Sequence, residues 1–393
     1  MKLADRLRTG EPARERFKQQ LAKLPMGNTV VIPTLAFALA LISPTRRRTL
    51  LDNVMRKLRI SDPKQRRYKI ETAKIRKVCK RTTPDPVIVP YDLSVSAPGF
   101  GEIYYSTMLA RYFSLHNKCV HFVFITDSFR TDFQSLHSKK EIADWVEQLT
   151  EIPRILLDKN CDQVSMMNWR EFVVFREQHS QATAPYMPFE DEVLARNPFY
   201  HHSFNLTNHL MATATSELLG QFLVTADELL ERVDITLPAA PYVTWHARHT
   251  RKWNPDRDLT ENEFVAIHAR LKTQYPQHSI MIVSDATGCA HFKELANKHD
   301  VKCLFSKDYS GSFMGDAALV LASSYFFLLR GGGMNAVSLF SNLPYEIIAA
   351  PANESVWSVG KFTSWATDKQ HFKRLDWGDQ SLYLPSPPTA QSA

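Results

Sequence analysis

The feature that most constrains this chain is a regular alternation of short apolar segments and longer amphipathic ones between residues 238 and 375. Five apolar segments of five or six residues have the composition of buried strands, and a stretch with helical spacing follows each of the first four. The predicted strands are 242–246, 279–284, 301–305, 325–329 and 344–348, and the predicted helices are 260–274, 288–299, 314–323 and 334–341. Strands that alternate with helices in this way are typical of a doubly wound parallel sheet.

A second α/β unit precedes this one along the chain. It opens with the strand-like segment 86–90, continues through a glycine-containing loop and a helix from about 103 to 114, and returns in an apolar strand at 120–125. A strand, loop, helix and strand in this order indicate a βαβ unit with parallel strands. Further helices are expected at 139–149 and 208–231, and a long loop is expected at 184–204.

The length and composition fit several folded units. A chain of 393 residues is too long for one ordinary core, and 44% hydrophobic with 23% charged residues is an ordinary globular composition. A helix-breaking Thr-Thr-Pro-Asp-Pro stretch marks a boundary at 82–86. We therefore predict a basic helical N-terminal extension, two Rossmann-like domains that face a cleft, and a disordered tail, with the bounds 1–84, 85–236, 237–380 and 381–393.

The positive charge is concentrated at the N-terminus. Residues 1–80 hold 21 Lys or Arg and 6 Asp or Glu, a net of +15, which leaves −8 for the other 313 residues. Such an arm suits either a peripheral contact with an anionic membrane or a solvated charged face. Nucleic acid is not expected as a partner, because the arm has no nucleic-acid-binding motif and few aromatic residues. The apolar run Val30–Ile42 is too short to span a bilayer comfortably, and a buried or surface segment is favoured over shallow membrane association.

The cysteines indicate a reducing environment. Their number is odd, they are widely scattered, and no two form a C-x-x-C pair; they are Cys79, Cys119, Cys161, Cys289 and Cys303. This pattern argues against a disulfide framework and against a cysteine zinc site, so a cytoplasmic location is expected. Asn205 begins an N-x-T glycosylation sequon, but such triplets occur often by chance and do not by themselves indicate secretion.

Basic residues follow the first strand of the C-terminal unit. In an open parallel sheet, ligands bind where strands end and helices begin. The segment after 242–246 carries His246, Arg248, Arg251 and Lys252. The planar guanidinium of arginine suits a diphosphate, so we predict an anion site here; the alternative is a solvated loop.

Two other strand ends carry candidate ligand groups. Asp285 follows the second strand, where a carboxylate can accept hydrogen bonds from a base or ribose or can simply cap the next helix. The fourth strand is followed by a glycine turn that opens a helix and comprises Arg330, Gly331, Gly332, Gly333, Met334 and Asn335. Because glycines let the backbone approach a ligand closely, this turn is predicted to hold phosphate.

The N-terminal unit contributes one candidate catalytic group. Gly99 and Gly101 form an incomplete dinucleotide fingerprint at its first strand-to-helix turn, and Glu102 follows them. If this loop faces the cleft, Glu102 is placed to deprotonate an acceptor hydroxyl; the alternative is a first-turn glutamate favoured by the helix dipole. No H-E-x-x-H or D-x-D motif lies near these loops, so no metal is implied.

Three segments resemble the C-terminal motifs of the fucosyltransferase superfamily, which includes the α1,6-, α1,2- and protein O-fucosyltransferases. They are Val243–Arg248, Ile282–Asp285, and Asp316 together with Ser323–Phe326, with a weaker likeness at 96–105. The resemblance covers about residues 238–350. It implies a GT-B architecture in which the N-terminal domain binds the acceptor and the C-terminal domain binds a nucleotide-sugar donor.

The resemblance also implies roles for single residues. Arg248 would bind the donor diphosphate and assist its departure, with His246 beside it. Asp285 would contact the base, and Ser323 and Ser324 would bind phosphate. Transfer would invert the anomeric centre and would need neither a metal nor a cofactor. The co-substrate would be a nucleotide sugar, and GDP-fucose is the favoured one.

The glycine turn departs from this family's pattern. Arg330-Gly-Gly-Gly stands in place of the serine-rich phosphate loop and is similar to the turn of other GT-B enzymes, such as heptosyltransferases and nucleotide-sugar 2-epimerases. The sequence therefore predicts a glycosyltransferase whose acceptor, a glycan, a lipid-linked saccharide, a small molecule or a protein, stays open. The alternatives are a 2-epimerase-like enzyme of the same fold and a non-catalytic scaffold that docks on a membrane through residues 1–80.

Overall fold

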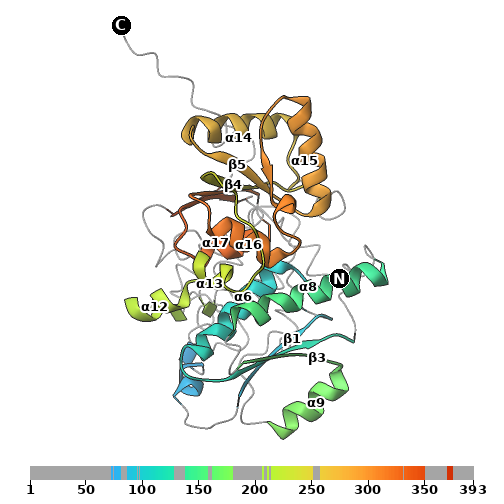
Figure 1. The fold of residues 1–393 in the computed structure, drawn as a ribbon. Helices are drawn as coiled ribbons and strands as arrows, with labels where there is room; N and C mark the ends of the chain where they lie inside the picture. Colours follow the sequence, from blue (N-terminus) through green and yellow to red (C-terminus); the bar gives the residue numbers. More distant parts are fainter. Residues whose placement is uncertain are drawn as a thin grey trace, which may run out of the picture. The chain divides into compact units, whose positions relative to one another are not determined.

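The chain is a mixed α/β protein with two parallel sheets, as predicted (Figure 1). The structure is a computed structural model, and both sheets belong to the unit Tyr68–Ala393. It describes residues 72–73, 75–80, 86–94, 96, 98–127, 138–157, 162–179, 206–207, 210–211, 214–250, 257–330 and 332–349, and the backbone of 370–374.

The first sheet has three parallel strands in the order β1-β2-β3. They are β1 (Val87–Asp92), β2 (Val120–Ile125) and β3 (Gln163–Met167). Helices α6 (Phe100–Ser114) and α8 (Lys139–Leu156) lie on one face, and α9 (Trp169–Gln178) lies on the other (Figure 1). β1 shows why both faces need cover: Val87 and Val89 belong to the core under α6 and α8, while Ile88 packs with Phe172 of α9.

The second sheet has six parallel strands in the order β6-β5-β4-β7-β8-β9. The strands are β4 (Tyr242–His246), β5 (Ser279–Val283), β6 (Leu304–Phe305), β7 (Phe326–Leu329), β8 (Tyr345–Ala349) and β9 (Gln370–Arg374). The strand order runs one way from β4 to β6 and the other way from β7 to β9. This reversal between β4 and β7 is the doubly wound arrangement that the alternation predicts.

Helices cover both faces of the second sheet (Figure 1). They are α14 (Glu261–Gln274) and α15 (Ala286–Lys298) on one side, and α16 (Phe313–Leu321) and α17 (Met334–Leu339) on the other. All four start and end within about two residues of their predicted bounds. The side chains that cap three of them explain this agreement, because Thr260, Asp285 and Ser312 each accept a hydrogen bond from the third residue of the helix that follows.

The middle of the chain differs from the sequence expectation. β3 and α9 were not predicted, because β3 is an edge strand with little apolar alternation. The continuous helix expected over 208–231 is wrong: α12 (Ser216–Phe222) and α13 (Ala226–Leu230) are separate. The chain leaves the helix at Val224, whose N–H donates to the carbonyl of Phe340, and Thr225 caps the next helix. The predicted loop at 184–204 lies outside the described residues.

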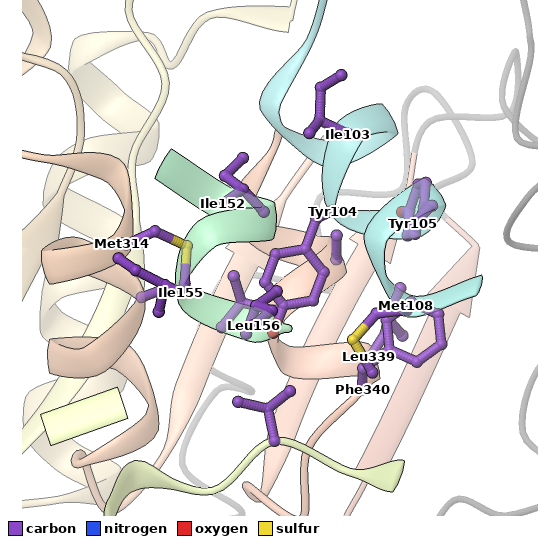
Figure 2. Packing of buried hydrophobic residues seen from close by; sticks show 14 of the residues in the cluster. Ile103, Tyr104, Tyr105, Met108, Ile152, Ile155, Leu156, Met314, Leu339 and Phe340 are labelled. Atoms are coloured by element: carbon purple, nitrogen blue, oxygen red, sulfur yellow. The ribbon is translucent and has the colours of Figure 1, made fainter. Parts of the chain in front are cut away.

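One apolar core runs between the two sheets. It is built where α6 and α8 of the first sheet meet α16 and α17 of the second, and Figure 2 shows its centre. Tyr104 and Tyr105 of α6 are buried against Phe340, with ring centroids 6.3 and 6.0 Å away. Burying a large apolar side chain contributes roughly 1.5–3 kcal/mol. The two sheets are therefore held together by packing of their helices.

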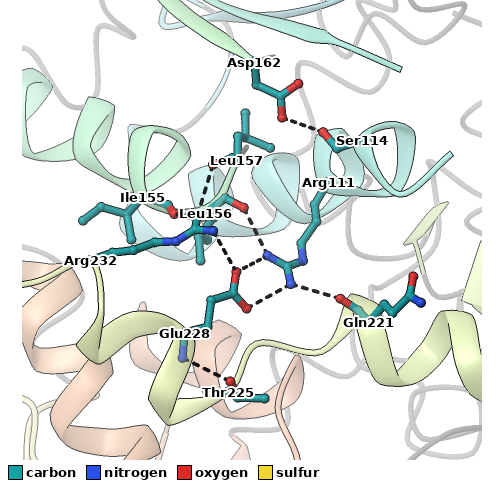
Figure 3. A network of polar contacts seen from close by, with 10 residues as sticks. All are labelled: Arg111, Ser114, Ile155, Leu156, Leu157, Asp162, Gln221, Thr225, Glu228 and Arg232. Atoms are coloured by element: carbon teal, nitrogen blue, oxygen red, sulfur yellow. Dashed lines mark hydrogen bonds and ion pairs between the residues drawn. The ribbon is translucent and has the colours of Figure 1, made fainter. Parts of the chain in front are cut away.

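A polar network holds α12 and α13 to the helices of the first sheet (Figure 3). Arg111 of α6 donates to both carboxylate oxygens of Glu228, at 2.5 and 2.9 Å, and to the carbonyls of Leu156 and Gln221. Arg232 donates to two carbonyls at the end of α8 and lies 3.8 Å from Glu228. Because α13 leads into β4, this network fixes where the second sheet begins.

We expect Arg111→Met to lower the free energy of unfolding by about 3 kcal/mol, because it leaves the largely buried carboxylate of Glu228 without its bidentate partner. Urea unfolding measures the change. Lys293→Met is the control, since Lys293 and Asp308 form an exposed pair that is worth less than ~1 kcal/mol. Equal losses in the two variants would show that the network adds nothing beyond a surface pair.

The cysteine expectation is wrong in one respect. Cys119, directly before β2, is disulfide-bonded, while Cys79, Cys289 and Cys303 are free thiols. An odd and scattered set does not exclude a single pair, because spacing along the chain does not tell which strand ends meet in space. Since structural disulfides persist in oxidising compartments, the cysteines no longer support a cytoplasmic location.

Contact with a membrane could involve a spanning helix or the basic N-terminal arm. No helix among the described residues is long and apolar enough to cross a bilayer. Most of the basic arm, residues 1–71, lies outside the described residues, and so does the apolar run Val30–Ile42 within it. Near the end of the arm, Ile75 and Val78 are buried in the apolar core. The proposed peripheral membrane contact therefore stays a prediction.

Candidate functional site

The two turns that sequence analysis singled out lie at the same end of the second sheet. β4 and β7 are hydrogen-bonded neighbours, with His246 in register with Leu328, so the segments that follow them emerge side by side. We call this end the carboxyl edge; it comprises 247–250 after β4, 284–285 after β5, and 330 with 332–333 after β7. It coincides with the reversal of strand order, where open α/β sheets bind ligands.

His246 connects the two turns directly. Its imidazole lies against Gly332, so closely that a Cβ added to Gly332 would be 2.1 Å from Nε2. Nδ1 lies 3.0 Å from the carbonyl oxygen of Val283, which can only accept, so Nδ1 carries the proton and donates. The pKa of His246 is lowered to about 4, mainly by burial and also by the charges of Arg248 and Arg257, although the hydrogen bond to Val283 opposes the shift. At neutral pH the ring is therefore uncharged, and Nε2 is an acceptor.

We expect acid to destabilise the protein through His246. The unfolded chain binds a proton at this residue below about pH 6.5, whereas the folded chain does not until about pH 4, so stability falls as the pH drops through that window. Relative to His246→Gln, the wild type should lose about 3 kcal/mol between pH 7.5 and 4. Urea unfolding at several pH values measures this difference. A difference that is independent of pH would mean that the ring is already protonated in the fold.

Comparing wild type with His246→Gln also removes the contribution of Asp316 to the pH dependence of stability, which has the opposite sign to that of His246. Burial raises the pKa of Asp316 to about 6 although Lys307 lies 2.6 Å away. This carboxyl binds its proton more readily in the folded state, so it stabilises the protein as the pH falls from about 6 towards 4. Because Asp316 is present in both proteins, it cancels in the difference.

Arg248 is buried and held in place by its neighbours. Its Nη2 donates to Thr250 Oγ1 at 3.0 Å, and its Nε lies 3.8 Å from Asp258 Oδ1. Asp258 in turn accepts from the backbone N–H of Thr250 at 2.9 Å. Only 7% of Arg248 is exposed, so its charge acts in a medium of low polarity. The fold thus holds a cation at the carboxyl edge in a fixed orientation.

Arg330 has a different environment from the one expected. Its backbone is left-handed, with φ at 65°, and its guanidinium forms a buried ion pair with Glu263 in the first turn of α14. Nη1 also donates to the carbonyl of Asp258 at 3.1 Å, while Arg257 donates to the carbonyl of Arg330. These contacts fasten α14 and the 257–259 segment to the end of β7. They support a positioning role, and the structure does not direct this side chain at the glycine turn.

Glycine turns from the two sheets meet at the carboxyl edge. A Cβ on Gly101 would lie 3.3 Å from the Cα of Gly333, so the two backbones are in contact. Beside them Phe100 stacks on Phe313, with ring centroids 4.6 Å apart and planes inclined by 6°. The predicted cleft loop therefore touches the predicted phosphate turn, in a closely packed contact.

Asn335 extends this contact into the interior. Its Oδ1 accepts a hydrogen bond from the hydroxyl of Tyr105 at 3.2 Å, and its backbone N–H donates to the carbonyl of Gly332. Both side chains are buried, and burial raises the pKa of Tyr105 well above its ordinary value, so the phenol stays protonated and donates. This hydrogen bond orients Asn335 across the boundary between the sheets.

Glu102 lies in the first turn of α6, one residue beyond Gly101. Its carboxylate folds back over Gly99, where an added Cβ would meet Oε2 at 2.2 Å. Gly99 thus gives the carboxylate the room that a side chain would fill. This position places Glu102 next to the contact between the two glycine turns.

Asp285 follows β5 at the carboxyl edge and caps α15. Its Oδ1 accepts from the N–H of Gly288 at 2.7 Å, as the helix-cap alternative predicts, and the residue is exposed. A Cβ on Gly288 would meet Ser284 Oγ at 2.0 Å, so a glycine is needed for this tight start of α15. Capping fixes the direction of the carboxylate and is compatible with a ligand contact.

The structure does not bring Ser323 and Ser324 to this site, contrary to the role that the resemblance implies. Both residues precede β7, and the N–H of Ser324 donates to the carbonyl of Tyr242 at the start of β4. Ser323 Oγ is buried in contacts with Thr244, Val320 and Tyr325. The six residue steps from 242 to 248 span about 20 Å, so these serines lie at the opposite edge from Arg248. The resemblance matched them by sequence, and the direction of β7 places them at the wrong end.

Several predicted groups cannot be placed. Gly331, Arg251 and Lys252 lie outside the described residues. Among the residues that the structure describes, no three His, Cys, Asp or Glu side chains gather closely enough to hold a metal ion.

Sequence analysis missed the residues that orient the site. They are Tyr105, Arg257, Asp258 and Glu263. Asp258 and Glu263 lie 72 and 67 residues before Arg330 in the chain, so only the pairing of β4 with β7 shows that they meet it. A usable signal existed for Tyr105, which follows Gly101 by one helical turn and hence shares its face of α6.

Sequence comparisons find no relatives: no protein-family model matches the chain, and no curated protein matches its sequence. Among solved structures, Escherichia coli heptosyltransferase WaaC with ADP-2-deoxy-2-fluoro heptose is 13% identical with a TM-score of 0.43, covering 74% of this chain and 94% of that one. A glycosyl transferase of family 9 from Veillonella parvula is 10% identical with a TM-score of 0.42, covering 75% and 86%. E. coli ADP-heptose lps heptosyltransferase II is 11% identical with a TM-score of 0.38, covering 75% and 91%. TM-scores this low carry no functional assignment, so the function has to be argued from the carboxyl edge.

Proposed function

We propose that this chain is a glycosyltransferase that binds the diphosphate of a nucleotide-sugar donor at the carboxyl edge, between β4 and β7. One observation carries the proposal: the strand order reverses between these two strands, and there His246 at the end of β4 lies against Gly332 in the turn after β7, with the buried Arg248 two residues beyond His246. A buried arginine together with backbone N–H groups at the start of a helix suits a diphosphate. The opposite edge, with the buried acid Glu346, has no such arrangement among the described residues.

The electrostatics favour catalysis as well as binding. Negative charge grows on the diphosphate as the bond to the sugar breaks, and a fixed cation in a medium of low polarity stabilises that charge most at the transition state. Thr250 and Asp258 keep Arg248 oriented before the donor arrives, so little reorganisation is needed. Because His246 is uncharged at neutral pH, its Nε2 can accept a hydrogen bond from a hydroxyl of the nucleotide sugar without adding charge to the site.

Glu102 is the proposed base. It lies in the first turn of α6, one residue beyond Gly101, whose backbone contacts Gly333 at the carboxyl edge. In this proposal the acceptor hydroxyl binds beside that contact. The acceptor oxygen, which gives its proton to Glu102, would bond to the anomeric carbon on the side opposite the C–O bond to the diphosphate, and that bond breaks beside Arg248. That arrangement corresponds to inversion, without a metal. GDP-fucose is the favoured donor on the resemblance of the 243–248 and 282–285 segments.

Isothermal titration with GDP, UDP and ADP sugars tests the donor assignment. We expect at least one of them to bind with a dissociation constant below 100 μM, a free energy of about −5.5 kcal/mol or better. If none binds more tightly than millimolar, the nucleotide-sugar assignment fails. ADP sugars belong in the panel because the glycine turn is similar to that of heptosyltransferases.

An acceptor-free assay separates transfer from epimerisation. A 2-epimerase-like enzyme of the same fold would convert the donor with no acceptor present, whereas a glycosyltransferase would leave it intact or hydrolyse it slowly. A scaffold that docks on membranes would bind no nucleotide at all. Sedimentation with anionic liposomes, with and without residues 1–67, measures the membrane contact independently of the donor and keeps the whole unit Tyr68–Ala393.

A further inference from the structure

Two histidines form a stacked pair beside Arg248. His249 directly follows it, and His291 lies in the second turn of α15. Their ring centroids are 3.7 Å apart and their planes are inclined by only 13°, so the imidazoles are in parallel face contact. The pair spans the carboxyl ends of β4 and β5, the two strands on the β6 side of the reversal.

Phe292 supports the pair from the interior. It is fully buried and its ring is steeply inclined to both imidazoles, with centroids 6.2 Å from His249 and 5.2 Å from His291. Both histidines are half-buried, so part of each remains at the surface. The protein therefore holds an aromatic surface in a fixed orientation where the carboxyl edge meets solvent.

The spacing of the strands relates this surface to the donor. Neighbouring strands lie roughly 4.8 Å apart, and a nucleotide is longer than one such step. A donor whose diphosphate lies between β4 and β7 must therefore extend across neighbouring strand ends. On the β5 side of Arg248 lie the histidine pair and the exposed carboxylate of Asp285, a hydrogen-bond acceptor.

We propose that the His249–His291 pair is the stacking surface for the nucleobase of the donor, with Asp285 accepting a hydrogen bond from the ribose or the base. This inference rests on the proposed function and deepens it, because it names the residues that recognise the base. Flat aromatic faces bind bases by stacking, which depends on the size of the base and only weakly on its hydrogen-bond pattern. Purine nucleotides should therefore bind more tightly than pyrimidine nucleotides.

Titration with GDP and with inorganic pyrophosphate separates the base from the diphosphate. His291→Ala is expected to weaken GDP binding by roughly 5- to 100-fold and to leave pyrophosphate binding unchanged. His291→Phe keeps an aromatic face and should restore most of the GDP affinity. His299→Ala is the control, because His299 ends the same helix, pairs with Glu261 and lies away from the carboxyl edge.

The outcomes distinguish this inference from the proposed function. If wild-type protein binds neither GDP nor pyrophosphate, the donor site fails and the base site fails with it. If wild-type protein binds both, but His291→Ala leaves GDP affinity unchanged or weakens both ligands equally, only the stacking surface is refuted. Failure of His291→Phe to restore GDP binding would equally overturn it, since any stacking role needs only a flat ring.

Discussion

Arg248→Ala is expected to reduce the rate of sugar transfer by about 10³-fold. Arg248 is the cation that the fold fixes at the carboxyl edge, and its interaction with the departing diphosphate strengthens as the bond breaks. The loss should therefore appear mainly in kcat, with a smaller rise in KM for the donor. Steady-state kinetics with a titrated donor measures both parameters.

The control for this variant must lose a buried ion pair without touching the site. Arg270→Ala is suitable, because Arg270 pairs with the buried Glu346 at 2.7 Å near the opposite edge of the sheet. We expect both variants to be less stable than wild type, because each removes the arginine that pairs with a largely buried carboxylate. Only Arg248→Ala should lose turnover per folded molecule. Wild-type kcat in Arg248→Ala would refute the assigned role.

Gly332→Ala is expected to lower both activity and stability. The added methyl group would lie 2.1 Å from Nε2 and 2.7 Å from Cδ2 of His246, so the ring has to leave its contact with Val283. Overpacking of this kind costs roughly 1–3 kcal/mol, and displacement of a group beside the diphosphate should reduce transfer about 100-fold. Thermal unfolding and kcat/KM measure the two effects.

A double variant shows whether the ring causes these losses. In His246→Ala the space for the methyl group is open, so adding Gly332→Ala to it should cost far less stability than in the wild type. Gly220→Ala, in a helix where an added Cβ meets nothing within 4 Å, should be neutral or slightly stabilising. If the losses of stability in the two single variants simply add in the double variant, the effect of Gly332→Ala does not arise from its contact with the His246 ring.

Much of the fold could be predicted because its signals are local. Five of the six strands of the second sheet are short apolar runs, and capping residues such as Thr260 and Asp285 mark the helix starts. The sixth strand, β9, is largely polar and is not predicted by this pattern. The order of strands and helices then leaves few topologies, since parallel crossovers have one hand. The same reasoning placed the residues after β4 and β7 at one edge, which the register between these strands bears out.

The site could be predicted only in part, because its detail depends on partners far apart in the chain. The partner of Arg330 is Glu263, and nothing in the 330–335 segment indicates that the guanidinium turns away towards α14. Ser323 and Ser324 match a sequence motif, but they precede β7, so the direction of this strand places them at the opposite edge of the sheet from Arg248. The contact of Gly101 with Gly333 depends on how α6 packs against α17, for which a single sequence holds no signal.

The most direct test of the central claim is a crystal structure of the protein with GDP bound. The account predicts that the diphosphate lies at the carboxyl edge, within hydrogen-bonding distance of the Arg248 guanidinium and of the backbone at 332–333. A diphosphate bound at the opposite edge near Ser323 and Glu346, or GDP that contacts neither Arg248 nor the glycine turn, would contradict it.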